Sequence, residues 1–215
     1  MGFSTEQELV DLFKTSFSSK FNIANKIVLE EVSLGFGIAD LVVTELKDST
    51  ETVKREKLTS IDINVYQIVK NKKKVSLDIV TTITGIKKQD IVKSLEKLIE
   101  YSFVKRMDSY YVFSNKYELS FKKNIAFEAK LRNWKKALMQ AYRYKWFADY
   151  SYVVLDEAHS KAAIENLPLF EKLNVGLLTI SISGVIKKYY HPKKQKPLDP
   201  TMQMLLSEVV MGSVI

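Results

Sequence analysis

Three segments of this 215-residue chain carry side chains whose types and spacing suit phosphodiester chemistry. Asp40 ends the run Gly-Phe-Gly-Ile-Ala-Asp. Glu128 and Lys130 lie in Phe-Glu-Ala-Lys, and Gln140 and Tyr144 follow in Gln-Ala-Tyr-Arg-Tyr. Two acids, an amine and a Gln/Tyr pair are the groups that a metal-dependent hydrolytic site needs.

The two carboxylates are candidate metal ligands. A phosphodiester repels an attacking hydroxide, and a divalent cation offsets that charge and acidifies the attacking water. Magnesium prefers hard oxygen ligands, commonly one or two carboxylates together with water. We therefore expect Asp40 and Glu128 to hold Mg²⁺, with Mn²⁺ as a substitute, and the carbonyl of Ala129 is a candidate third ligand.

Local spacing predicts how the remaining groups face the site. Glu128 and Lys130 are two residues apart, so on a strand their side chains point to one face. Charged groups on an inner face are costly unless they pair or bind something. Lys130 would orient the attacking water or stabilise charge on the phosphate. Gln140 and Tyr144, four apart, would share one face of the helix that follows.

The elements that must position these residues follow from periodicity and turn signals. Residues 5–20 predict a helix, with Thr5 and Glu8 as a capping box. Residues 27–32 and 38–46 predict a hairpin around a glycine turn at 34–37. Further expected elements are strands at 125–131, 152–155 and 175–180 and a basic loop at 186–197. Helices are expected at 134–148, capped by Asn133, at 160–173, with Pro168 disturbing the later part, and at 199–210. Strand–helix–strand units predict an α/β fold with a mainly parallel sheet and helices on both faces.

A polar linker at 47–60 leads into a different pattern. Three helices, near 63–69, 76–82 and 90–101, precede a short hairpin at 103–113. This order resembles a winged helix-turn-helix, and the turn at 83–86 with the helix behind it carries the resemblance. We expect it to be an insertion, so that the domains are 1–50 and 122–215 for a discontinuous core and 60–118 for the insert.

The ordered motifs resemble the PD-(D/E)XK nuclease superfamily, and the Gln-x-x-x-Tyr element resembles its RecB-like members. The resemblance covers about 1–46 and 122–182. It implies a restriction endonuclease-like αβββαβ core, a mixed sheet flanked by helices, and magnesium-dependent DNA cleavage with Lys130 as the catalytic lysine. Ala39 stands where the family pattern has proline. Many relatives add a glutamate from the first helix, for which Glu6 and Glu8 are both candidates.

Charge predicts a polyanionic partner. The formal charge is +8 and the pI about 9.3, which favours nucleic acid over its rival, an anionic membrane. Residues 50–120 hold 14 Lys/Arg and 9 Asp/Glu, so they contribute +5. A winged helix usually places its last helix in the major groove. The candidate DNA contacts are Lys87, Lys88, Lys93, Lys97, Lys105 and Arg106. The alternative for this module is protein interaction or dimerisation.

Several function classes are excluded or disfavoured. The chain has no cysteine, which excludes disulfides, thiolate zinc sites and cysteine nucleophiles and fits a reducing cytoplasm. No apolar run approaches the roughly 18 residues of a membrane span, and no secretory signal is evident. There is no phosphate-binding Gly-x-x-x-x-Gly-Lys loop. His159 and His191 are too few and too far apart to predict a zinc site.

Three functions remain open at this point. The first is a metal-dependent DNA endonuclease, for which cutting both strands favours a homodimer. The second is a non-catalytic DNA-binding regulator that keeps the scaffold. The third is an accessory subunit whose partner protein directs the cut. The target, and DNA rather than RNA as substrate, are not predicted by any residue pattern.

Overall fold

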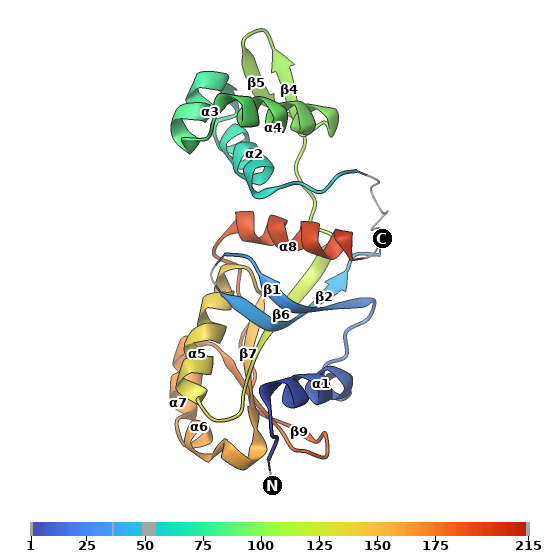
Figure 1. Ribbon diagram of the computed structural model, residues 1–215, viewed down its shortest axis with the longest axis vertical. Helices are drawn as coiled ribbons and strands as arrows, with labels where there is room; N and C mark the ends of the chain where they lie inside the picture. Colours follow the sequence, from blue (N-terminus) through green and yellow to red (C-terminus); the bar gives the residue numbers. More distant parts are fainter. Residues whose placement is uncertain (1, 36, 49–54, 214–215) are drawn as a thin grey trace. The chain divides into compact units, whose positions relative to one another are not determined.

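The computed structural model describes residues 2–35, 37–48 and 55–213, and these residues divide into two compact units. Unit 1 comprises residues 1–50 and 121–200, and unit 2 comprises residues 51–120 and 201–215. Figure 1 labels their helices and strands. Residue 36 of the predicted turn and residues 49–54 of the predicted linker lie outside the described residues.

Unit 1 is built on a mixed six-stranded sheet with the order β1-β2-β6-β7-β8-β9. Its strands are β1 (Lys26–Ser33), β2 (Ile38–Leu46), β6 (Phe121–Lys130), β7 (Tyr150–Asp156), β8 (Gly176–Ile180) and β9 (Ile186–Tyr190). Only β6–β7 and β7–β8 pair in parallel. The expectation of a mainly parallel sheet was wrong, because β1, β2 and β9 each join through antiparallel pairing.

The hairpin that carries Asp40 is confirmed. β1 and β2 pair antiparallel from Lys26 opposite Glu45 to Ser33 opposite Ile38. Gly35 and Gly37 have φ values of 104° and 116°, a backbone region that glycine enters without steric cost. The glycine pair therefore sets the turn from which the second strand, and Asp40 near its start, emerges.

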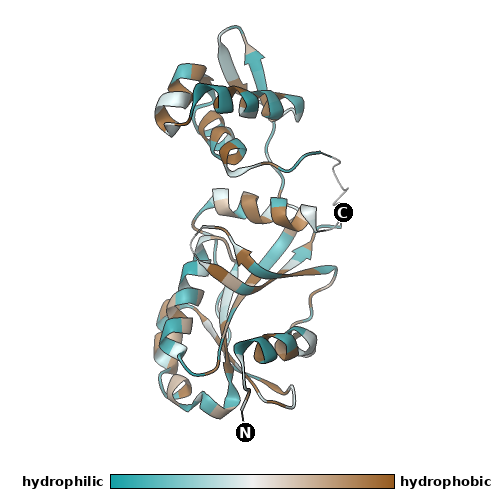
Figure 2. Ribbon diagram, viewed as in Figure 1, coloured by the Kyte–Doolittle hydropathy of each residue, from teal (hydrophilic) through white to brown (hydrophobic). Residues whose placement is uncertain are grey.

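Helices cover both faces of the sheet (Figure 1). The helix α1 (Glu6–Ser16) lies on one face, where the Phe13 and Phe127 rings are 5.0 Å apart. Helices α5 (Trp134–Arg143), α6 (Lys161–Glu165) and α7 (Leu167–Leu173) lie on the other. Figure 2 shows hydrophobic stretches running through the central strands between these layers. This burial provides the main favourable free energy of folding.

Local capping explains where the helices begin. Thr5 Oγ1 accepts a hydrogen bond from the Glu8 amide at 3.1 Å, and Glu8 Oε2 accepts one from the Ser4 amide at 2.9 Å. The predicted capping box thus closes one residue earlier than expected, on Ser4. Asn133 caps α5 by accepting from the Lys136 amide at 3.1 Å.

The predicted helix over 160–173 is two helices in the structure. α6 ends at Glu165 and α7 begins at Leu167, with Pro168 in its first turn. Proline has no amide proton, and its ring clashes with the preceding helical turn, so it is tolerated only near a helix start. Pro168 therefore accounts for the break.

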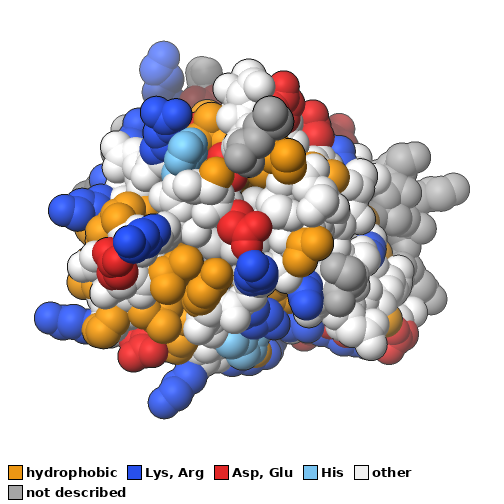
Figure 3. All heavy atoms as spheres, turned by 90° about the horizontal axis from the view of Figure 1, so that it is seen from below, with side chains coloured by type: hydrophobic (Ala, Val, Ile, Leu, Met, Phe, Trp, Pro, Cys, Tyr) orange, Lys and Arg blue, Asp and Glu red, His pale blue; other side chains and the backbone are white. Residues whose placement is uncertain are grey.

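The expected basic loop at 186–197 begins with a strand instead. Residues 186–190 form β9, an edge strand antiparallel to β8, and Ile186 is buried while Lys187 and Lys188 are exposed. Exposed lysines are a common device for keeping an edge strand from pairing with other chains. Figure 3 looks onto this end of unit 1, where lysines, acids and hydrophobic side chains are interspersed.

Gly176 at the start of β8 provides a stability test. A Cβ atom built there would lie 2.0 Å from Cδ1 of Tyr152, whose side chain is fully buried. We expect Gly176→Ala to destabilise the protein by about 1–3 kcal/mol through overpacking. Gly212→Ala is the control, since nothing lies within 4 Å of that position. Calorimetric unfolding that finds the two variants equally stable would contradict this packing.

Unit 2 combines four helices with a small sheet. Its elements are α2 (Ser60–Lys72), β3 (Lys74–Ser76), α3 (Leu77–Thr84), α4 (Lys88–Glu100), β4 (Val104–Met107), β5 (Tyr110–Phe113) and α8 (Pro200–Gly212). The three strands form a sheet in the order β3-β5-β4. Gly85 ends α3 with φ of 65°, the left-handed conformation common after a helix. No local pattern predicted β3, which has only three residues.

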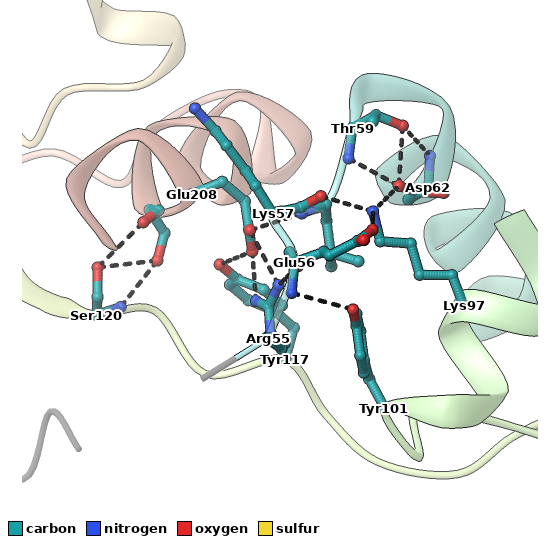
Figure 4. A network of polar contacts seen from close by, with 12 residues as sticks. Arg55, Glu56, Lys57, Thr59, Asp62, Lys97, Tyr101, Tyr117, Ser120 and Glu208 are labelled. Carbon is teal, nitrogen blue, oxygen red and sulfur yellow. Dashed lines mark hydrogen bonds and ion pairs between the residues drawn. The ribbon is translucent and has the colours of Figure 1, made fainter. Parts of the chain in front are cut away.

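The C-terminal helix belongs to unit 2, whereas the sequence analysis assigned residues up to 215 to the core. Glu208 of α8 accepts hydrogen bonds from Arg55, from the Leu58 amide at 2.8 Å and from the Tyr117 hydroxyl at 2.7 Å (Figure 4). Met204 is buried in the same core as α2 and α4. These contacts, distant in sequence, explain the difference.

No helix within residues 2–35, 37–48 and 55–213 has the length and apolar character required to cross a bilayer.

Candidate active site in unit 1

Asp40 and Glu128 lie on neighbouring strands. β2 and β6 pair antiparallel as far as Leu41 opposite Phe127, and Asp40 and Glu128 are the neighbouring residues of this last pair. The Asp40 charge contributes to the raised pKa of Glu128, so the two carboxyl groups lie close together. Asp40 Oδ2 also accepts a hydrogen bond from the Ala129 amide at 2.7 Å. The two acids, 88 positions apart in sequence, are therefore brought together.

Lys130 lies beside the same carboxylates. Its Nζ is 3.2 Å from Glu128 Oε1 and 2.9 Å from Glu6 Oε2, and it donates to the Ala129 carbonyl at 3.0 Å. Of the two glutamates considered in the first helix, Glu6 reaches this cluster. Glu8 instead bonds to the Ser4 amide. The amine is thus held between two acids from separate elements.

The structure places Tyr144 and Gln140 differently with respect to Glu128. Tyr144 lies in a 3₁₀ turn directly after α5. Its hydroxyl contacts Glu128 Oε2 and donates to the Ile38 carbonyl at 2.7 Å. Gln140 Oε1 is buried and has no hydrogen-bond partner among the described residues. Tyr144 therefore joins the acid cluster directly, while Gln140 contributes a buried acceptor that is free to receive a donor.

Burial raises the pKa values of Asp40 and Glu128. Desolvation raises the pKa of Glu128, the nearby Asp40 charge raises it further, and Tyr144 and Lys130 only partly oppose this. Desolvation also raises the pKa of Asp40, against the Ala129 hydrogen bond. A tyrosine hydroxyl has one proton, whereas the Ile38 carbonyl can only accept. The single Tyr144 proton is therefore shared between Glu128 Oε2 and the Ile38 carbonyl.

The environment of Lys130 favours its charged form. Burial opposes a charge on Lys130, but its hydrogen bond to Glu6 and the charges of Glu128 and Asp40 outweigh this effect and raise its pKa. An ammonium group in a site with little water exerts a stronger field than it would in bulk solvent. Lys130 is thus suited to stabilise negative charge that develops next to it.

The donor set is compatible with a small hard cation. Within the described ranges, no group of three or more His, Cys, Asp or Glu side chains is arranged to hold a metal. Glu128 Oε1 is buried and pairs with the Lys130 ammonium at 3.2 Å, but it accepts no hydrogen bond in those ranges, so it keeps a lone pair for a cation. Mg²⁺ commonly uses one or two carboxylates and keeps several waters. The residues available to it are Asp40, Glu128 and the Ala129 carbonyl.

A pocket of 210 Å³ opens beside Asp40, lined by Gln7, Val10, Glu30, Glu31 and Asp40. In the β1–β2 register Glu31 falls between the pairs Glu30–Leu41 and Val32–Ala39, and its charge adds to the raised pKa of Asp40. Glu31 was not predicted to belong to the site, because an acid in a hairpin arm resembles an ordinary exposed strand residue. Only the pairing register could have identified it.

The six candidate DNA contacts have different environments in unit 2. Lys87, Lys105 and Arg106 are exposed. Lys88 is exposed and pairs with Asp78 at 3.3 Å. Lys97 is held internally: its Nζ donates to the Lys57 carbonyl at 2.7 Å and pairs with Glu56 and Asp62 at 3.4 and 3.5 Å. Lys93 lines an acidic depression. The exposed cations therefore lie at the start of α4, at Lys93 and on β4.

Comparisons with protein-family models, with curated proteins and with solved structures found no match to this chain.

Proposed function

We propose that the chain is a metal-dependent DNA endonuclease that hydrolyses phosphodiester bonds. The observation that carries this proposal is the convergence of Asp40, Glu128 and Lys130 from two strands, with Lys130 Nζ 3.2 Å from Glu128. The element order α1-β1-β2-β6-α5-β7 also agrees with the αβββαβ core expected for a PD-(D/E)XK nuclease.

Each residue has a distinct role in this proposal. Asp40, Glu128 and the Ala129 carbonyl would hold Mg²⁺, which when bound offsets phosphate charge and acidifies water. Lys130 stabilises charge on the phosphate or orients the attacking water. Tyr144 fixes the Glu128 carboxyl through its hydroxyl. Glu6 holds the Lys130 ammonium at 2.9 Å, which makes it a positioning residue.

Unit 2 is proposed to grip DNA as a winged helix. Its order α2-β3-α3-α4-β4-β5 and the β3-β5-β4 sheet support this interpretation. Lys87 and Lys88 at the start of α4 would contact the duplex together with Lys105 and Arg106 of β4. Such lysines contact phosphates and position a protein without reading sequence. Lys97 is left out because its ammonium is already paired.

Plasmid cleavage tests the proposal. Purified full-length protein is incubated with supercoiled plasmid in Mg²⁺, in Mn²⁺ and in EDTA. We expect nicked or linear products only with a cation, and loss of activity in Asp40→Asn. Absence of cleavage under all conditions, or cleavage that persists in EDTA, would contradict it. Binding to DNA without cleavage, unchanged by EDTA, would instead support a non-catalytic regulator.

The raised acid pKa values predict how cation binding depends on pH. A cation binds ionised carboxylates, so any proton on Asp40 or Glu128 must leave first. Because burial raises both pKa values above their ordinary 3.8 and 4.5, Mn²⁺ affinity should rise with pH beyond the usual carboxyl range and then level off. Binding should also release protons.

Isothermal titration of Mn²⁺ in two buffers with different ionisation enthalpies measures this proton release. Glu128→Gln should weaken binding and reduce the number of protons released. Affinity that is independent of pH in the wild type, with no proton release, would show that these acids are not the ligands.

A further inference from the structure

Unit 2 contains a larger depression than the one beside Asp40. Its volume is 590 Å³, and it lies between the start of α2 and the exposed side of α4. We call it the acidic groove. It shares no residue with the active-site cluster, so it calls for a separate explanation.

The groove is negative although the chain is positive. Five carboxylates and two ammonium groups line it, a net of −3, in a chain with formal charge +8. The acids are Glu56, Asp62, Asp90, Glu96 and Glu100. Lys97 is already paired with Glu56 and Asp62 (Figure 4). The local charge therefore opposes the binding of a polyanion at this surface.

Three of these acids have no ion-pair partner in the described part of the chain. Asp90, Glu96 and Glu100 lie on α4, and Glu96 and Glu100 are exposed. Glu96 and Glu100 are four positions apart on the helix, where like charges repel one another. Their unused charge is available to an external cationic group.

A buried hydroxyl also faces the groove. The Ser94 side chain is only 3% exposed and lines the groove, yet its Oγ has no hydrogen-bond partner among the described residues. A buried polar group without a partner costs about 1–3 kcal/mol. Serine within a helix usually bonds to the preceding turn, which Ser94 does not. Ser94 therefore leaves a buried polar group without a partner in the wall of the groove.

We propose that the acidic groove docks a lysine- or arginine-bearing segment of a partner protein. The carboxylates of Asp90, Glu96 and Glu100 would pair with its cations, and Ser94 Oγ would accept from a donor that enters the groove. DNA is disfavoured here because phosphates would meet the same carboxylates. The groove thus assigns the α4 face to protein contact and removes Lys93 and Lys97 from the proposed DNA contacts.

Fluorescence anisotropy with a labelled arginine- and glycine-rich peptide tests the proposal on the full chain. The main variant combines Asp90→Asn, Glu96→Gln and Glu100→Gln, which keep side-chain size while removing charge. We expect binding to weaken by at least about tenfold, and Ser94→Ala to weaken it by about twofold to tenfold. Added salt should weaken wild-type binding.

The control removes the same charge elsewhere, at exposed positions, through Asp108→Asn, Glu165→Gln and Glu171→Gln. This control should bind the peptide as the wild type does. Equal binding by the main variant and the control would overturn the proposal. A wild-type chain that self-associates in sedimentation and does not bind the peptide would also overturn the proposal if the main variant alone lost self-association. The occupant of the groove would then be a second copy of this chain.

DNA binding by the same variants separates this inference from the nuclease proposal. We expect the main variant to cleave and bind plasmid as the control does. If it instead bound DNA much more tightly than the control, the groove would be facing DNA and the inference would fail. If the wild type binds the peptide but does not cleave plasmid under any condition, the docking inference stands and only the nuclease proposal is rejected.

Discussion

Replacing Lys130 with methionine should lower the rate of plasmid cleavage by about 10²- to 10³-fold, the usual cost of removing one preorganised electrostatic group. Methionine keeps much of the side-chain length and removes the ammonium. In the structure that ammonium lies 3.2 Å from Glu128 and 2.9 Å from Glu6. The loss should therefore come from the missing charge beside the reacting phosphate rather than from misfolding.

Lys122→Met is the matched control for this prediction. Lys122 lies on the same strand β6 and also forms an ion pair, with Asp48 at 2.6 Å, but its side chain is 43% exposed. Initial rates under saturating Mg²⁺, together with thermal unfolding of both variants, make the comparison. Equal rates for the two variants would show that Lys130 has no special role in cleavage.

Replacing Glu208 with alanine should destabilise unit 2 by about 3–5 kcal/mol, because removing one partner of a buried pair leaves the other charge uncompensated. The side chains of Glu208 and Arg55 are 1% and 9% exposed. Glu208 also accepts from Tyr117 and from the Leu58 amide. All of these donors would lose their partner together.

Glu165→Ala provides the comparison for Glu208→Ala. Glu165 pairs with Lys161 at 3.9 Å, and those side chains are 60% and 91% exposed. Such a surface pair contributes under about 1 kcal/mol. Denaturant unfolding followed by circular dichroism should show a large loss for Glu208→Ala alone. Similar small losses in both variants would indicate that α8 is not anchored through Glu208.

Local sequence signals predicted most of the elements. The glycines at 35 and 37 marked the hairpin turn, and β2 covers Ile38–Leu46 as expected. Asn133 and Gly85 marked a helix start and a helix end. These signals act through the backbone of a few adjacent residues, so no knowledge of the tertiary structure was needed.

The features that the sequence analysis missed depend on pairing at long range. β9 exists because residues 186–190 find an open edge on β8. α8 joins unit 2 because Glu208 meets Arg55, 153 positions away. Spacing along the chain identifies neither β8 as the partner of residues 186–190 nor Arg55 as the partner of Glu208. Residues 186–197 were therefore predicted to be a loop, and the last helix was predicted to belong to the core.

The candidate site was predicted in its residue types but not in its surroundings. Two acids in hairpin and strand contexts, with a lysine two positions after the second, suggested a shared face. Selecting Glu6 over Glu8 required the contact of Glu6 with Lys130, and identifying Glu31 required the β1–β2 register. The pairing of Lys97 with Glu56 and Asp62 also depends on tertiary contacts.

A crystal soaked in Mn²⁺ and measured at the manganese edge tests the central claim most directly. The account predicts one anomalous peak in contact with the carboxylates of both Asp40 and Glu128, absent from crystals of Asp40→Asn. No peak at these carboxylates, in crystals where other sites show that manganese has entered, would contradict the claim that this pair of acids holds the catalytic cation.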